Sequence, residues 1–171
     1  MELEEFKNKV FPVQAKLLRF AKRLIHQEEE AEDSVQDTFL RLWKMREKLD
    51  TYNSIEALAM RIVKNICLDK LKSKRNQMLN LDNHAYQLES GSQTPARATE
   101  LRNSVDLMRH AMDCLPDQQK MIIQLRDIEE LEFEEISEVM GLTVNNVRVN
   151  LSRGRKKIKE IMTKNYNYGI Q

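Results

Sequence analysis

Apolar residues recur at steps of three and four along most of the chain, which is the spacing of one face of an α-helix. Such stretches cover about residues 3–26, 29–46 and 54–77. A polar break, Leu49–Ser54, separates the second stretch from the third, and Ser54 can cap the helix that follows it. The pattern therefore predicts a first half made of three helices.

Residues 80–99 lose this periodicity. They are rich in Ser, Thr, Asn and Gln, and they contain Gly91 and Pro95. This composition is typical of a mobile connection. We therefore expect a flexible linker between a first domain, residues 1–79, and a second domain, residues 100–165.

The helical spacing returns after the linker. It predicts one helix over about 100–115 and another over about 116–127, with Pro116 in the first turn, where proline is well tolerated. Two further helices follow around a tight turn at Gly141. The fold class expected is all-α: two small helical domains, the second a four-helix domain that ends in a helix-turn-helix.

The helix-turn-helix is the strongest single signal in the chain. Gly141 can adopt the positive φ that ends the first helix, and Thr143 is a good N-cap for the second. Arginine suits guanine and asparagine suits adenine when the start of such a helix lies in the major groove. The candidate contacts to DNA are Thr143, Asn145, Asn146, Arg148, Val149, Ser152, Arg153 and Lys156.

Apolar residues occupy the other side of the same two helices. In the first these are Phe133, Ile136, Val139 and Met140, and in the second Val147, Leu151, Ile158 and Ile161. Arg155, Lys156 and Lys159 follow and are expected to bind phosphates, which carry no base information. The alternative is a generic amphipathic helix with a basic outer face. It would require the glycine, the cap, the apolar steps and the basic run to coincide.

Charge is segregated along the chain although the formal net charge is only +1. Residues 27–40 hold six acidic residues and no basic ones, and residues 127–138 hold seven acidic residues and no basic ones. Residues 141–164 hold seven basic residues against Glu160. This asymmetry favours one surface for an anion and another for a basic partner. Each run taken alone also fits a solvated helix face.

The remaining composition excludes several classes of protein. Cys67 and Cys114 lie in apolar helical patterns without a CxxC or a Cys/His cluster, so we expect reduced core thiols in a cytoplasmic protein, with no metal site and no cofactor. No run of about 18 apolar residues is present, so insertion into a membrane is not expected. The N-terminal MELEEFKNKV also lacks the apolar stretch of a signal peptide.

Several segments resemble bacterial sigma factors. The stretch LPDQQKMIIQLRDIEELEFEEISEVMGLTVNNVRVNLSRGRKKIKEIM resembles their C-terminal promoter-reading domain. The stretches AEDSVQDTFLRLWKMREKL and ALAMRIVKNICLDKLKSKR look like their N-terminal domain. Two domains and a short linker are similar to the extracytoplasmic-function (ECF) subgroup of the sigma-70 family. The resemblance implies a subunit that binds core RNA polymerase and directs promoter-specific initiation of transcription, without covalent chemistry of its own.

The resemblance also assigns a polymerase surface. Asp33, Gln36 and Asp37 match the pattern that binds an Arg-rich coiled coil of the β′ subunit, and their spacing places them on one helix face. Trp43 would add apolar area, whereas Phe39 is expected to pack in the core. The second domain would contact the β flap and the −35 element. Control in this subgroup comes from an anti-sigma factor, often membrane-linked.

A second stripe on the third predicted helix would contact the −10 element, together with the Leu49–Ser54 loop. It consists of Arg61, Lys64, Asn65, Lys72 and Arg75, with Leu68 among them. Basic groups that follow a backbone are what capture of an opened strand requires. An exposed helix face without a ligand is the alternative.

Departures from the family concern specificity. Leu58 and Met60 stand where many members carry Trp and Tyr, and Val149 and Asn150 replace a hydroxyl and a cation. The usual −35 sequence is therefore not carried over, and the short loop before the third helix leaves −10 specificity open. The competing function is a helix-turn-helix regulator that does not engage core polymerase. An enzyme is disfavoured because the carboxylate pairs lack a nucleophile, a ligand set or a phosphate loop.

Overall fold

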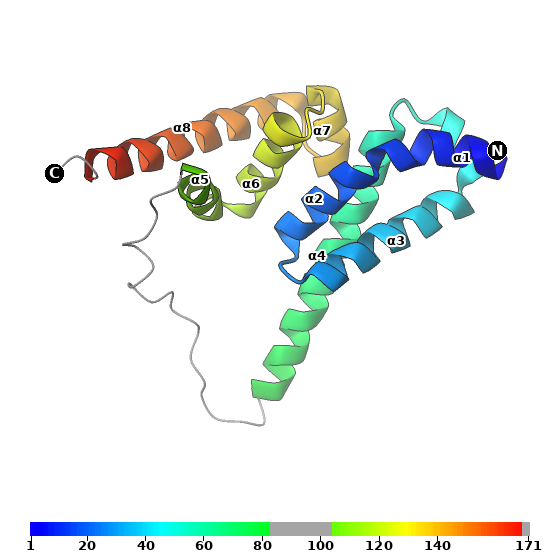
Figure 1. Ribbon diagram of the computed structural model, residues 1–171, viewed down its shortest axis with the longest axis horizontal. Helices are drawn as coiled ribbons and strands as arrows, with labels where there is room; N and C mark the ends of the chain where they lie inside the picture. Colours follow the sequence, from blue (N-terminus) through cyan, green and yellow to red (C-terminus); the bar gives the residue numbers. More distant parts are fainter. Residues whose placement is uncertain (83–103, 169–171) are drawn as a thin grey trace.

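The computed structural model describes residues 1–82 and 104–168, and every regular element within these two ranges is a helix (Figure 1). The all-α prediction is thereby confirmed for this part of the chain. The linker predicted over 80–99 falls mostly outside the described residues. Its first three residues, 80–82, belong to a helix instead.

The first half begins with two helices where one was expected over 3–26. These are α1, Leu3–Val10, and α2, Gln14–Leu24, joined by a 3₁₀ turn, η1, at Phe11–Val13. Pro12 lies in that turn. Because proline has no N–H and its ring clashes with the preceding helical turn, the α-helical hydrogen bonds cannot continue through it.

Two longer helices complete the first half. α3 spans Glu28–Lys44, the 3₁₀ turn η2 spans Arg46–Thr51, and α4 spans Ile55–Asp82. The predicted cap is confirmed, since the Ala57 N–H donates to Ser54 Oγ at 3.1 Å. The expected polar break is partly helical, and Leu49 within it is fully buried.

Within residues 104–168 the second half contains four α-helices, as predicted. They are α5, Ser104–Asp113; α6, Asp117–Ile123; α7, Phe133–Met140; and α8, Val144–Tyr168. The helix expected to reach residue 127 ends earlier. A π-helical turn, η4, occupies Gln124–Ile128 and leads into the bend before α7.

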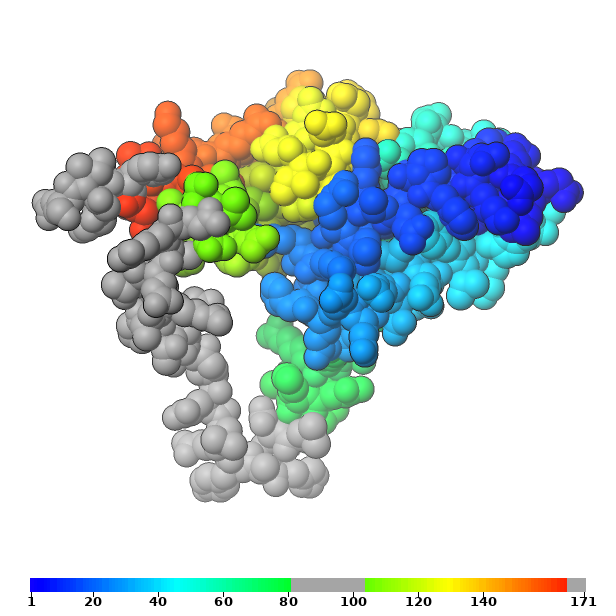
Figure 2. Space-filling model, in the orientation of Figure 1, coloured from blue at the N-terminus to red at the C-terminus, as the bar shows by residue number. Residues whose placement is uncertain are grey.

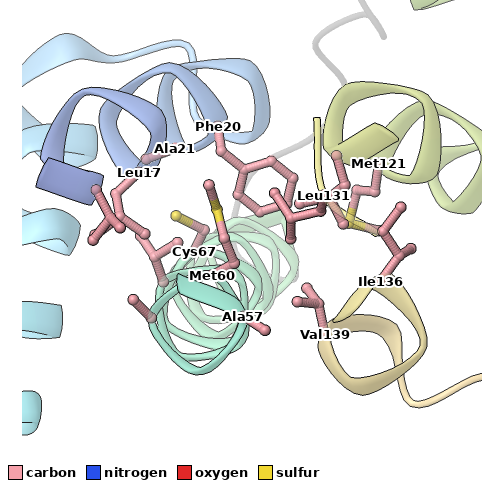
Figure 3. Close-up of a cluster of buried hydrophobic side chains, with 14 of the residues drawn as sticks. Leu17, Phe20, Ala21, Ala57, Met60, Cys67, Met121, Leu131, Ile136 and Val139 are labelled. Atoms are coloured by element: carbon pink, nitrogen blue, oxygen red, sulfur yellow. The ribbon is translucent and has the colours of Figure 1, made fainter. Parts of the chain in front are cut away.

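The two halves are docked on each other through a shared apolar core. α7 packs against α4, and the surfaces of the halves meet directly in the space-filling view (Figures 1 and 2). In Figure 3, buried side chains from α2 and α4 face buried side chains from the second half: Leu17, Phe20, Ala21, Ala57 and Met60 on one side, and Met121, Leu131, Ile136 and Val139 on the other. The local patterns did not predict this docking.

Candidate functional site

The turn between α7 and α8 has the local structure that the sequence predicts. Gly141 ends α7 with φ of +66°, and its N–H donates to Ser137 O at 2.9 Å. Thr143 caps α8, because its Oγ1 accepts the Asn146 N–H at 3.2 Å. The two hydrogen bonds lie within the ten residues 137–146, so the geometry of the turn is fixed locally.

One side of α8 is buried and the other is open to solvent. Val147 and Leu151 are almost completely buried, so the intervening positions face outward. Every residue in this part of the chain that is predicted to contact the −35 element is exposed: Thr143, Asn145, Asn146, Arg148, Val149, Ser152, Arg153 and Lys156. Amide, hydroxyl and guanidinium donors thus share one accessible surface near the start of the helix, as major-groove reading requires.

Two further side chains belong to this surface and were not predicted. The guanidinium carbon of Arg148 lies 5.0 Å from the centroid of the Phe133 ring, and that of Arg126 lies 4.7 Å from it. Phe133 was expected in the buried stripe of α7, but it is only half-buried. A π-face cannot be recognised from helical spacing, so the sequence carried no signal for this contact.

The basic run in the middle of α8 is divided. Lys156 and Lys159 are exposed, as the phosphate-binding prediction requires. Arg155 instead pairs with Asp127, its Nε donating to Oδ2 at 3.0 Å and its Nη2 bonding Oδ1. This hydrogen bonding raises the pKa of Arg155 further. Arg155 therefore ties α8 to the π-helical turn η4.

The α4 stripe predicted for the −10 element is not a single exposed surface. Arg61, Asn65, Lys72 and Arg75 are exposed. Lys64 is only 9% exposed, and its Nζ donates to Val139 O, at the end of α7, at 2.5 Å. Burial, and secondarily the charge of Arg61, lowers the pKa of Lys64. In this conformation α7 therefore covers one of the five candidates.

The loop before α4 is likewise involved in docking. Residues 51–53 are exposed, but Ser54 Oγ lies 2.5 Å from Glu135 Oε1 of α7 and donates a hydrogen bond to it. The same hydroxyl oxygen caps α4. Ser54 thus connects the start of α4 to the first helix of the helix-turn-helix.

Exposed acidic and amide side chains share one face of α3. Asp33, Gln36 and Asp37 are all exposed on it. Trp43 is half-buried, with its ring edge-on to Phe6 at 5.0 Å and the Arg46 guanidinium 4.5 Å from its centroid. The structure therefore brings the four predicted polymerase-binding residues onto a common helix, with the aromatic residue held in place.

An apolar groove adjoins this face, between α1 and α3. It has a volume of about 490 Å³ and is lined mainly by Leu3, Phe6, Phe11, Gln36, Phe39, Leu40 and Trp43. Phe39, expected in the core, is half-buried, and its ring lies 5.8 Å from that of Phe11. A partner that pairs with the acidic face could therefore also insert apolar side chains beside it.

Polar contacts complete the docking of the two halves, and Glu129 is their centre. Its carboxylate is fully buried and accepts hydrogen bonds from Arg19 Nη2 at 2.7 Å and from Gln124 Nε2 at 3.0 Å. Its backbone oxygen accepts a further bond from Lys16 Nζ at 3.0 Å. Burial of an unpaired carboxylate is very costly, so the cation from α2 is what makes this position possible.

The two cysteines differ in their surroundings. Cys67 is fully buried, and burial raises the pKa of its thiol. Cys114 is exposed, with its sulfur 3.8 Å from His110 Nε2, so the prediction that it is a core thiol is wrong. It lies in the turn directly after α5.

No group of three or more His, Cys, Asp or Glu side chains within residues 1–82 and 104–168 could hold a metal ion. None of the described helices combines the length and apolar character that crossing a bilayer demands.

Comparison with protein families supports the resemblance in both halves. Residues 12–77 match the model described as Sigma-70 region 2, and residues 106–158 match the one described as Sigma-70, region 4. The two matches together cover more than half of the chain and occur in the order that the motifs predict.

Curated relatives extend over most of the chain. The ECF RNA polymerase sigma factor SigE of Mycolicibacterium smegmatis is 28% identical over 151 residues, covering 87% of this chain but only 58% of SigE itself. A probable RNA polymerase sigma factor of Haemophilus influenzae is 26% identical over 168 residues, covering 89% of this chain and 87% of that protein. The RNA polymerase sigma factor CarQ of Myxococcus xanthus is 28% identical over 147 residues, covering 84% of this chain and 80% of CarQ.

Solved structures share the fold. The sigma factor RpoE of Bartonella quintana, in complex with the anti-sigma factor NepR, has a TM-score of 0.70 at 22% identity, covering 94% of this chain and 98% of RpoE. CnrH, in complex with the cytosolic domain of CnrY, has a TM-score of 0.65 at 22% identity, covering 95% of this chain and 90% of CnrH.

Proposed function

Since the chain belongs to the sigma-70 family, we propose that it is an alternative sigma factor, which binds core RNA polymerase and directs promoter-specific initiation of transcription. The observation that carries the proposal is the open, polar and basic surface at the start of α8. This surface lies in the second half of the chain, which matches region 4, and the first half of the chain matches region 2.

The core polymerase would bind the acidic face of α3. Asp33 and Asp37 are exposed at i, i+4 spacing with Gln36 beside them, so they can pair with a row of cations on a partner helix. Trp43 and the adjoining groove would receive apolar side chains of the same partner. Region 4 would bind the β flap.

Promoter DNA would bind the two basic surfaces. The exposed start of α8 would read the −35 element, with Arg148 as its main guanidinium donor. Arg61, Asn65, Lys72 and Arg75 on α4 would follow the opened strand at the −10 element. Lys64 would join them only after leaving Val139.

This assignment requires the two halves to separate on a promoter. Elements centred near −35 and −10 are about 25 base pairs apart, which is about 85 Å along B-form DNA. In the docked form Lys64 of α4 bonds Val139 of α7, the helix directly before the reading helix. Even the whole of α8, with 25 residues, is only about 37 Å long, which is less than half of the distance of about 85 Å between the two elements. The docked form therefore belongs to the protein off the promoter.

A partner that controls the free protein is part of the proposal. The structures of RpoE and CnrH are complexes with NepR and with a domain of CnrY, which supports binding of an anti-sigma factor by this chain. The protein would act in the cytoplasm, where the polymerase is, and would carry out no covalent chemistry.

Run-off transcription with purified core polymerase tests the proposal. RNA ends produced on genomic DNA would first identify the promoters, and a defined template would then be used. A promoter-specific product that requires this chain is expected. DNA binding without any such product would favour the alternative, a helix-turn-helix regulator.

The polymerase surface is tested by Asp37→Arg. Affinity for core polymerase, measured without DNA, should fall strongly because a cation then faces the cationic partner. Glu160→Arg, with the same charge change on α8, is the matched control and should bind normally. Equal affinity of the two variants would refute the α3 assignment.

A further inference from the structure

Phe133 makes a contact that neither the family match nor the docking of the halves accounts for. It is the first residue of α7, and its half-buried ring lies under two arginines, Arg126 at 4.7 Å and Arg148 at 5.0 Å. Arg126 comes from the π-helical turn and Arg148 from α8, so three separate elements meet at this ring.

The first arginine is held in place by the backbone. Arg126 Nη1 donates to Leu131 O at 2.6 Å and lies 3.2 Å from Glu132 Oε2. The Glu132 N–H in turn bonds Glu135 Oε2 at 2.9 Å, which fixes the start of α7. The ring is therefore set between an anchored guanidinium and the core of the second half.

The second arginine is the free member of the group. Within residues 1–82 and 104–168 the Arg148 guanidinium forms no ion pair, so its N–H donors stay available to an outside ligand. A guanidinium over an aromatic face is attracted by the ring quadrupole and needs no hydrogen bond to stay there. The ring thus restrains the cation while leaving its donors unused.

We propose that Phe133 is a positioning residue for DNA reading, which holds the Arg148 guanidinium in the orientation that contacts a base edge. The inference rests on the proposed −35 function of α8. Ordering a long side chain on binding costs affinity, so a guanidinium ordered beforehand discriminates better between bases. The charge of Arg126 beside it also favours an anionic ligand over solvent.

The aromatic face, rather than apolar bulk, is what the proposal requires. Phe133→Leu keeps apolar contact with the core but removes the face, whereas Phe133→Tyr keeps the face. The holoenzyme, assembled from core polymerase and full-length variant, would be bound to promoter DNA and to a panel with each −35 base substituted. The ratio of two affinities is the readout, because it does not depend on the fraction of protein that is folded.

Arg148→Ala identifies the base that Arg148 reads as the position where discrimination is lost. Phe133→Leu should reduce discrimination at that same base about two- to fivefold, the range expected for an exposed cation–π contact. Phe133→Tyr should behave like the unmodified protein, and Phe133→Leu combined with Arg148→Ala should match Arg148→Ala alone.

Two results would overturn the inference, and they are distinguishable. In the first, Phe133→Leu discriminates between bases as well as the unmodified protein, while Arg148→Ala loses discrimination. Arg148 would then still read the −35 element, but Phe133 would have no part in that reading. In the second, Arg148→Ala shows the same base preferences at −35 as the unmodified protein. Arg148 would then not read a base, and Phe133 could not act by positioning it. Failure of run-off transcription by the unmodified chain would instead contradict the proposed function as a whole.

Discussion

Arg19 on α2 donates two hydrogen bonds to the fully buried carboxylate of Glu129, 110 positions later in the chain, from Nη2 to Oε2 at 2.7 Å and from Nε to Oε1 at 3.3 Å. Each residue belongs to a different half of the molecule. The buried carboxylate of Glu129 therefore receives its cationic partner only when the two halves are docked.

Removing the cation should destabilise the protein strongly. Arg19→Ala leaves the Glu129 carboxylate buried with Gln124 as its remaining side-chain donor. Because the Arg19 side chain is itself half-exposed, we expect a loss of about 1–3 kcal/mol in the free energy of unfolding, the scale of leaving one buried group without a hydrogen-bond partner. Urea denaturation followed by circular dichroism measures it.

The control for Arg19→Ala is an ion pair at the surface. Lys7 and Glu4 are 2.9 Å apart on the outer side of α1, so Lys7→Ala should cost at most about 0.5 kcal/mol. Arg19→Ala combined with Glu129→Gln should cost less than the sum of the two single changes, because no unpaired charge remains. A loss no larger than that of Lys7→Ala would show that the pair between Arg19 and Glu129 does not stabilise the docked form.

The buried ammonium of Lys64 predicts a pH dependence. Its pKa is lowered from the ordinary value of 10.5, so the folded protein binds this proton less tightly than the unfolded chain does. The resulting penalty is present at neutral pH and disappears as pH rises from the folded pKa toward 10.5. The stability of Lys64→Met relative to the unmodified protein should therefore be greatest at pH 7 and decline toward pH 10.

Urea midpoints between pH 7 and pH 10 check this trend. Lys72→Met, on the exposed part of the same helix, is the matched control for the loss of a lysine ammonium. Identical profiles for Lys64→Met and Lys72→Met would mean that Lys64 is solvated in solution.

The two thiols should differ sharply in reactivity. Cys114 is exposed, whereas Cys67 is fully buried and burial raises the pKa of its thiol, so little thiolate is present or accessible. A maleimide should modify Cys114 rapidly under native conditions and Cys67 only in urea. Mass spectrometry of the protein and of Cys114→Ser distinguishes the sites. Comparable native rates at both thiols would contradict the buried position of Cys67.

Gly154 marks a close approach between α8 and α6. A Cβ placed there would lie 2.6 Å from Ile123 Cδ1 and 3.5 Å from Gln119 Cβ. Gly154→Ala should be nearly neutral, since the terminal methyl of Ile123 can move and alanine favours the helix by about 1 kcal/mol. Gly154→Leu should destabilise by about 1–3 kcal/mol through overpacking. Thermal unfolding compares the two, and similar midpoints would show that α6 and α8 separate easily.

Much of the local structure could be predicted because its causes lie within a few residues. The turn at Gly141 depends on a backbone hydrogen bond to a residue four positions away, and the caps by Thr143 and Ser54 each depend on one side chain and a backbone N–H three positions away. Helical spacing also predicted which side of α8 faces outward. The break at Pro12 was missed, although the lack of a proline N–H is itself a local signal.

The sequence by itself determined most of the helices, the exposed polar and basic side of α8 and the acidic face of α3, because periodicity and caps act within one element. Only the tertiary structure decided that Lys64 and Glu129 are buried, that Cys114 is exposed, and that Phe133 lies under Arg148. These outcomes depend on how separate elements pack. The partners of Lys64 and Glu129 are 75 and 110 positions away, and no repeat along the chain encodes contacts over such separations.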